Sequence, residues 1–370
     1  MKILVTGGAG FIGSHLVDAL VAKGDRVTVY DRFEPQVHGK RKPGYLNPEA
    51  EYVRGDMCDR QKFKKILKRV TRVFHEAAAV GVGQSMYQVQ HYIEANTLGT
   101  AVLLDLLVNE RTKVQKLVVA SSMSLYGEGS YRCETCGILH PPLRGATQLR
   151  RGQWELACPH CRRRLSPRPT PEEKQLLPTS IYALSKRHQE EMPLLIGNTY
   201  KLPVVALRYF NVYGPRQSLS NPYTGVCAIF SSRIKNERPP LIYEDGLQSR
   251  DFVHVDDIVR ANLLVMEKKE ADYGVLNVGT GKATTILGIA KTLIRLYGET
   301  LKPEIVGKYR QGDIRHCFSD ISKIKRLGFS PSVTLEKGLG DLVSWGKGIR
   351  AVDRTEEADR ELVQRGLRIR

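Results

Sequence analysis

The segment that most constrains the fold is GGAGFIG (Gly7–Gly13), which directly follows the apolar run Ile3–Val5. Glycines here allow a tight turn, let the backbone approach a pyrophosphate and let the following helix lie close to the strand. Asp31 ends the next predicted strand, where a carboxylate can bind both ribose hydroxyls of an adenosine. The context therefore predicts a site for NAD rather than NADP. The expected contacts on this loop and strand end are Gly7, Gly10, Phe11, Ile12, Gly13, Asp31 and Arg32.

Short apolar runs alternate with helical segments from the N-terminus to about Gly127. Strands that alternate with helices of this length favour an α/β fold with a doubly wound parallel sheet. The predicted strands are 3–6, 26–30, 51–54, 73–75 and 116–120, and the predicted helices are 11–23, 61–69 and 93–109. A second half begins near Tyr213, and we place 241–243 and 275–278 in it.

The chain of 370 residues carries 57 basic and 39 acidic side chains, a net charge of +18. Such a charge raises the question of nucleic acid, but no nucleic-acid-binding motif accompanies it, so we expect a solvated basic surface and no nucleic-acid partner. The sequence has no run of eighteen apolar residues and opens directly on a strand. We expect a cytoplasmic protein with no membrane contact.

Four of the seven cysteines form two C-x-x-C pairs, Cys133/Cys136 and Cys158/Cys161, separated by 21 residues. Without an export signal, this spacing indicates a metal site rather than disulfides, and four thiolates saturate tetrahedral zinc. We therefore expect a structural zinc in a zinc-ribbon-like insertion over 129–175, with an iron centre or free thiols as alternatives. The insertion has few large apolar residues, so metal binding would supply its folding free energy.

A second constellation consists of Ser122, at the end of a predicted strand, and Tyr182 and Lys186, which are four residues apart. On a helix, Tyr182 and Lys186 share one face, where an ammonium can lower the pKa of a phenol. Ser122 could hold a reacting hydroxyl in line. These three residues are the candidate catalytic groups.

Together with the glycine loop, Ser122 and Tyr182-x-x-x-Lys186, the segments LRYFNVYGPRQ and SRDFVHVDDI resemble the extended short-chain dehydrogenase/reductases that act on nucleotide sugars. The resemblance implies a Rossmann-like NAD domain over 1–212, to which 250–266 returns, and a smaller substrate domain over 213–345. From its composition we expect 346–370 to be a charged C-terminal tail, in which 355–370 is a solvated helix or tail. The resemblance also implies a homodimer through the helices 93–109 and 182–200, the second of them kinked or shortened by Pro193.

The resemblance also assigns ligand contacts to individual positions of this sequence. It places Asp56 and Met57 at the adenine, and Ala77 and Ala79 along the pyrophosphate and the nicotinamide ribose. Further implied cofactor contacts are Asn96, Phe210, Tyr182 and Lys186, and implied contacts to a nucleoside diphosphate sugar are Ser122, Ser124, Asn211, Arg250 and Arg315.

Related 4,6-dehydratases carry Thr-Asp-Glu where this chain has Ser122-Met123-Ser124. Loss of water from the sugar needs an acid and a base, which Met123 and Ser124 lack, so the expected activity is 4-epimerisation through a transient 4-keto sugar. Further segments, among them EPQVHG, SNPYTGV and the cysteine insertion, resemble dTDP-L-rhamnose 4-epimerases. The alternatives are UDP-glucose or UDP-glucuronate 4-epimerisation, an NAD(P)-dependent nucleotide-sugar reductase and a dinucleotide-sensing regulator.

Overall fold

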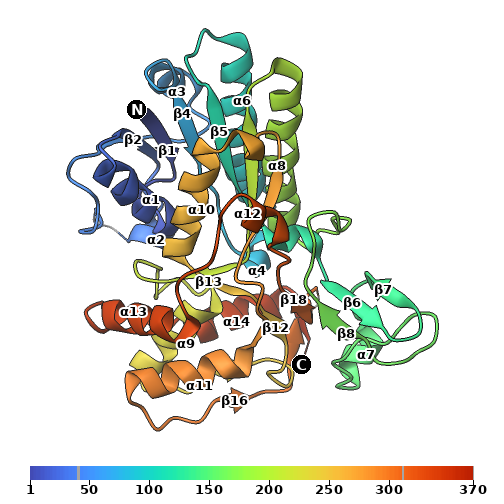
Figure 1. The fold of residues 1–370 in the computed structure, drawn as a ribbon. Helices are drawn as coiled ribbons and strands as arrows, with labels where there is room; N and C mark the ends of the chain where they lie inside the picture. Colours follow the sequence, from blue (N-terminus) through green and yellow to red (C-terminus); the bar gives the residue numbers. More distant parts are fainter. Residues whose placement is uncertain (40–41, 311, 370) are drawn as a thin grey trace.

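The structure is a computed structural model that describes residues 1–39, 42–310 and 312–369 (Figure 1). Its largest element is a seven-stranded sheet in the order β14-β9-β5-β4-β1-β2-β3, and each neighbouring pair is parallel. The predicted doubly wound parallel sheet is thus confirmed. Its strands are β1 (Lys2–Thr6), β2 (Arg26–Asp31), β3 (Glu51–Arg54), β4 (Arg72–His75), β5 (Lys116–Ser122), β9 (Val204–Tyr209) and β14 (Val275–Val278).

Helices cover both faces of this sheet and give the molecule a three-layered body (Figure 1). On helix α1, Leu16, Val17 and Leu20 lie three and four residues apart and are buried, so this apolar stripe packs against the strands. The helices on the face of α1 are α1 (Phe11–Ala22), α10 (Val255–Glu267) and α12 (Ser322–Arg326), and those on the other face are α3 (Arg60–Leu67), α6 (Gly99–Asn109) and α8 (Ile181–Tyr200).

The strand order reverses at β1, which lies between β2 on one side and β4 on the other. From β1 the chain continues to β2 on one side, and from β4 it continues to β5 on the other side, so the two connections run in opposite directions. In a doubly wound sheet this reversal opens a crevice at the carboxyl ends of the strands, and ligands bind there. Both the glycine loop after β1 and Ser122 at the end of β5 lie at this edge of the sheet.

A second core lies beyond the carboxyl edge of the sheet, between three helices (Figure 1). Phe230, Leu293 and Leu342 are among its buried side chains, one from each helix. The helices are α9 (Val226–Lys235), α11 (Ile286–Tyr297) and α13 (Leu335–Lys347). The short strand pairs are β10 (Asn211–Tyr213) with β13 (Phe252–His254), β11 (Leu241–Ile242) with β16 (Glu304–Ile305), and β12 (Ser249–Arg250) with β15 (Thr284–Thr285) and β18 (His316–Cys317).

The cysteine-containing insertion projects from one side of the molecule as a small three-stranded antiparallel sheet (Figure 1). Its buried core holds only five residues, two of which are Cys133 and Cys158. The elements are β6 (Ser130–Cys133) between β7 (Gly137–Leu139) and β8 (Ser166–Arg168), with the short helix α7 (Ala146–Arg150).

The structure contradicts three sequence predictions in whole or in part. The segment 275–278 is not part of the second half, because β14 pairs with β9 and covers the edge that β9 would otherwise expose. Pro193 does not shorten its helix, since α8 continues to Tyr200, and the alternative of a kink at Pro193 stays a prediction. In the C-terminal region the predicted helix is confirmed, but it is not simply solvated: α14 (Thr355–Gln364) buries Ala358 and Leu362, and β19 (Arg368–Ile369) pairs with β17 (Tyr309–Arg310).

Across the part of the chain that the structure describes, no helix combines the length and the apolar character needed to cross a membrane.

Candidate active site

The glycine loop closes tightly between β1 and α1. Gly7 has φ +69°, and a Cβ added to it would lie 2.7 Å from the Cα of Ala77 on the neighbouring strand end. A Cβ on Gly13 would lie 2.3 Å from the carbonyl oxygen of Gly7. Only glycine fits at either position, so the backbone amides at the start of α1 remain open to an anionic ligand.

Asp31 ends β2 beside this loop, as the sequence predicts. Its carboxylate accepts backbone N–H groups from Ala9 at 3.0 Å and Phe33 at 2.7 Å. The guanidinium of Arg32 is held by the carboxylate of Glu34 and lies 3.7 Å from that of Asp56. These two carboxylates offset the charge of Arg32, so its guanidinium is not a free cation for a 2′-phosphate.

The loop after β4 forms the next part of the wall, and Asn96 holds it in place. The amide of Asn96 accepts a hydrogen bond from the nitrogen of Ala79 at 2.7 Å and donates to its carbonyl oxygen at 3.1 Å. Asn96 itself is fully buried in a π-helical segment, η1 (Ile93–Leu98), that precedes α6. It therefore supports the loop rather than lining the pocket, whereas Ala77 and Ala79 line it.

Ser122, Tyr182 and Lys186 come together on the pocket wall, from the end of β5 and the first turns of α8. The hydroxyl of Ser180 caps α8 by accepting the N–H of Ala183 at 3.1 Å, which fixes the start of the helix. The hydroxyl of Ser124, also on the wall, donates to that of Ser122 at 2.9 Å.

The electrostatics of this group differ from the sequence expectation. Burial raises the pKa of Tyr182, and the hydrogen bond with Ser122 opposes that rise only in part. Lys186 donates to the carbonyl of Ala120 and, at 2.9 Å, to Gln189. Burial lowers the pKa of Lys186 to about 8, although Glu76 and Glu190 oppose the shift. A neutral phenol and an amine that is still mostly protonated at neutral pH therefore lie together on the wall.

The sequence analysis missed Glu76, which also lines the pocket. Burial raises the pKa of this carboxyl to about 7, and the phenol of Tyr209 donates to it at 2.8 Å. A carboxylate placed directly after the apolar strand 73–75, at the ligand-binding edge of a parallel sheet, was the available signal.

The predicted substrate residues divide into two groups. Ser122, Ser124 and Asn211 line the pocket, and the side-chain oxygen Oδ1 of Asn211 is buried without a hydrogen-bond partner. Phe210, predicted as a cofactor contact, also lines it. Arg250 and Arg315 do not line it. Arg250 donates to three backbone carbonyls, including that of Ile314 at 2.7 Å.

Arg315 is a structural residue in this geometry, contrary to the prediction that it contacts a diphosphate. Its side chain is fully buried and makes ion pairs with Glu155 of the insertion at 2.6 Å, Glu244 at 2.8 Å and Asp245 at 2.7 Å. Three carboxylates satisfy the guanidinium. It therefore anchors the insertion, together with Arg144, whose guanidinium pairs with Glu244 at 2.8 Å.

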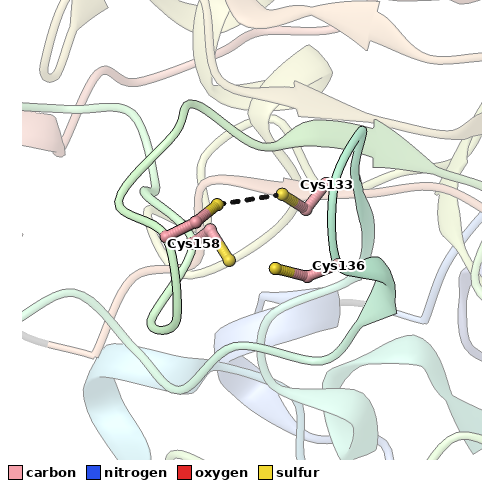
Figure 2. Close-up of side chains that lie close together, drawn as sticks. Cys133, Cys136 and Cys158 are labelled. Carbon is pink, nitrogen blue, oxygen red and sulfur yellow. Dashed lines mark hydrogen bonds between the residues drawn. The ribbon is translucent and has the colours of Figure 1, made fainter.

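The four cysteine sulfurs of the insertion lie within 4.8 Å of one another. Figure 2 shows the sulfurs of Cys133, Cys136 and Cys158 turned toward one shared space. The Sγ atoms of Cys133 and Cys161 are 3.4 Å apart. Tetrahedral zinc with Zn–S bonds of about 2.3 Å separates its sulfurs by about 3.8 Å, so this set fits such an ion.

Comparisons with known proteins identify the chain. Residues 3–144 and 164–279 match the model of the NAD dependent epimerase/dehydratase family, and the gap between the two ranges falls inside the cysteine insertion. A dTDP-L-rhamnose 4-epimerase of Burkholderia thailandensis is 35% identical over 352 residues, 93% of this chain and 94% of that protein.

Two solved structures are similar over nearly the whole chain. A UDP-glucose 4-epimerase of Thermotoga maritima, with UDP-glucose, has a TM-score of 0.77 at 34% identity, covering 94% of this chain and 99% of the other. A UDP-glucuronic acid 4-epimerase of Bacillus cereus, with UDP-glucuronic acid and NAD, has a TM-score of 0.76 at 29% identity and the same coverage. The chain therefore belongs to the NAD dependent epimerase/dehydratase family.

Proposed function

We infer that the chain is an isomerase, an NAD-dependent nucleotide-sugar 4-epimerase, and we propose that it interconverts dTDP-L-rhamnose and dTDP-6-deoxy-L-talose. One observation carries the inference. The glycine loop, Asp31 and the group Ser122, Tyr182 and Lys186 line one pocket at the carboxyl edge of the sheet. A dinucleotide held by the glycine loop would therefore meet a proton-transfer group in the same pocket.

The residues present fit NAD, because glycine at 7 and 13 lets the loop close tightly against its own backbone and leaves the amides at the start of α1 open to a pyrophosphate. When bound, NAD supplies reversible hydride transfer at C4 of the sugar. We propose that Tyr182 takes the proton of the C4 hydroxyl, that Ser122 holds this hydroxyl in line, and that Lys186 supplies positive charge beside the phenol. Tyr182 then returns the proton after the 4-keto sugar has turned its other face.

Epimerisation, rather than loss of water, is supported by Met123 and Ser124. Both line the pocket beside Ser122, and neither side chain can act as the carboxylic acid or carboxylate base that a dehydration needs. The wall at this point offers one hydroxyl, from Ser124, and one thioether. These two positions therefore supply no acid and base for a dehydration, which favours the removal and return of one proton and one hydride.

The choice of dTDP-L-rhamnose is supported by the Burkholderia relative, because the alignment with this chain covers 94% of that protein. The UDP-glucose 4-epimerase of Thermotoga, at 34% identity, supports UDP-glucose as the second candidate. The decisive experiment incubates the purified protein, without added cofactor, with dTDP-L-rhamnose, UDP-glucose and UDP-glucuronate, and follows the anomeric and C4 protons by NMR. Conversion of dTDP-L-rhamnose is expected.

Two other outcomes would overturn parts of this proposal. Conversion of a UDP-sugar alone would replace the substrate and keep the reaction. Stoichiometric consumption of added NAD(P)H would make the protein a reductase, because an epimerase ends each turnover with its cofactor as it began. Binding of NAD with no conversion of any sugar would favour the dinucleotide-sensing regulator.

We further propose that Cys133, Cys136, Cys158 and Cys161 hold a structural zinc ion. The support is their clustering within 4.8 Å and the burial of Cys133 and Cys158 in a core of five residues. Four thiolates leave no open position for a substrate, so the ion would fold the insertion rather than take part in the reaction.

We also propose a homodimer through α6 and α8. These helices pack beside each other on one face of the sheet (Figure 1). Leu98, Leu184 and Leu195 leave 47%, 36% and 68% of their surface exposed at this side of the molecule. A second copy would cover them.

A further inference from the structure

The C-terminal helix α14 contacts two loops that approach the pocket from different parts of the chain. The carboxylate of Glu361 accepts hydrogen bonds from the phenol of Tyr87, at 2.6 Å, and from the phenol of Tyr223. The two phenol oxygens are themselves 2.6 Å apart. One carboxylate thus joins Tyr87, which follows α4 (Val82–Ser85), to Tyr223, which precedes α9.

The residues next to Glu361 strengthen the same contact. Leu362 packs so closely on α4 that its Cδ2 would lie 3.3 Å from a Cβ at Gly83. The guanidinium of Arg365 lies 4.3 Å from the centre of the Tyr87 ring. Helix α14 and the residue that follows it therefore pack against the loop after β4.

Both joined loops supply pocket wall. Val82 and Gln84 line the pocket from the first loop, and Tyr223 lines it from the second, with Asn221 and Thr224. The two walls also meet at a pair of amide hydrogen bonds, because Gln36 donates to Gln84 at 3.1 Å and to Asn221 at 3.2 Å. The distance between the walls therefore depends on these bridges and on the carboxylate of Glu361.

Other contacts hold α14 in place without Glu361. Tyr243 donates to Asp359 at 2.9 Å, and Arg238 pairs with Glu356 at 3.2 Å. Removal of the Glu361 carboxylate should therefore leave the helix docked while it releases the two phenols. This separation makes the role of Glu361 testable apart from the fold.

We propose that Glu361 is a positioning residue that fixes Tyr87 and Tyr223 so that the two loops enclose the nucleotide sugar. The C-terminal helix is then part of the reaction site. Glu361 does not reach the reacting atoms, and it acts by setting the shape of the wall. This inference rests on the proposed function, since it takes the ligand between the two loops to be the nucleotide sugar.

The test compares Glu361→Leu, which has no acceptor, with Glu361→Gln, which keeps one. For Glu361→Leu we expect KM for the nucleotide sugar to rise about tenfold, with kcat changed far less and the Tm and the bound NAD retained. For Glu361→Gln, KM for the nucleotide sugar should lie between the values for Glu361→Leu and the wild type. Tyr223→Phe added to Glu361→Leu should raise KM by less than Tyr223→Phe alone, because the hydrogen bond of Tyr223 to Glu361 is already lost and only its contact with the Tyr87 phenol is left to remove. Glu357→Leu, an exposed position on the same helix, is the matched control.

An unchanged KM in Glu361→Leu, or an equal rise in Glu357→Leu, would overturn the inference. If Glu361→Leu does not fold, Glu361→Gln decides by the same criterion. If the wild type converts no sugar, the proposed function fails, and the positioning role is then decided by calorimetry with dTDP. Weaker dTDP binding in Glu361→Gln than in the wild type would support the role, whereas equal binding, or no binding to either protein, would overturn it.

Discussion

Tyr182 is the residue on which the proposed proton transfer depends, because its phenol lines the pocket beside Ser122. Tyr182→Phe keeps the ring and its packing but removes the group that takes the proton. We expect kcat to fall by about 10²- to 10⁴-fold while bound NAD is retained. NMR measures the conversion, and the absorbance of the denatured supernatant measures the NAD.

The matched control for this prediction is Tyr200→Phe. Tyr200 ends the same helix with 57% of its surface exposed, so its hydroxyl should not affect the rate. Full activity in Tyr182→Phe would contradict the assignment of the proton to this phenol.

Glu76 makes the stability of the protein depend on pH. Its pKa is about 7 in the folded state and about 4.3 when the chain is unfolded, so folding favours the protonated carboxyl. A group with a raised pKa contributes fully below its unfolded pKa, and that contribution is lost as the pH rises to about 7. Glu76→Gln mimics the protonated form and should gain about 1 to 2 kcal/mol over the wild type between pH 5 and pH 8, after allowance for partial exposure.

Thermal unfolding at the two pH values measures this difference. Glu49→Gln, at an exposed position, should show the same Tm difference from the wild type at both. A Glu76→Gln variant whose advantage does not grow with pH would contradict the burial of a proton-binding carboxyl at this site.

At the scale of elements, the cysteine insertion has the smallest core. Cys158 is 1% exposed and contributes both to that core and to the proposed metal site. Cys158→Ser should abolish the zinc measured by mass spectrometry. It should also speed tryptic cleavage within 129–175, because metal binding supplies much of the folding free energy of so small a unit.

Cys58→Ser provides the comparison, since Cys58 lies outside the insertion and its thiol donates to the carbonyl of Glu94. It should leave zinc and cleavage unchanged. Full zinc in Cys158→Ser would remove Cys158 from the ligand set, and wild-type protein free of metal would remove the zinc itself.

Elements set by local chemistry could be predicted from the sequence, and those set by distant partners could not. The strand, glycine loop and helix around Gly7 follow from steric limits within a few residues, and the structure confirms them. The family resemblance assigns Arg315 to a diphosphate, and the planar arginine fork suits phosphate. One of its actual partners, Glu155, lies 160 residues away in the insertion. No local sequence pattern indicates where the insertion packs.

The same limit applies to the molecule as a whole. The charged composition of 346–370 suggested a solvated tail, because only Ala358 and Leu362 of α14 are buried and two apolar residues give a weak periodic signal. The position of the Glu361 side chain depends on its hydrogen bonds with Tyr87 and Tyr223, which are 274 and 138 residues away in the sequence. Thus the pocket floor, built on successive strand ends, was predictable, whereas the contacts that close its walls were not.

Assembly is the remaining property at this scale. Leu195 leaves 68% of its surface exposed on α8, in line with Leu184 three helical turns away. A two-fold interface contains the same patch of both chains, so it would include Leu195 of each copy. Leu195→Glu would therefore place two carboxylates in one apolar interface. We expect the dimer dissociation constant to rise by at least about 100-fold. Light scattering on a sizing column, over a range of concentrations, measures the mass.

Ile138→Glu separates this effect from a general loss of apolar surface, because Ile138 is 60% exposed but lies on the insertion. That variant should keep the mass of the wild type. If the wild type elutes with the mass of one chain at every concentration, or if Leu195→Glu stays dimeric, the interface does not lie on α6 and α8, and the exposed leucines need another explanation. A monomeric Leu195→Glu variant that still converts its substrate would show in addition that each chain carries a complete site, as the single-chain pocket walls require.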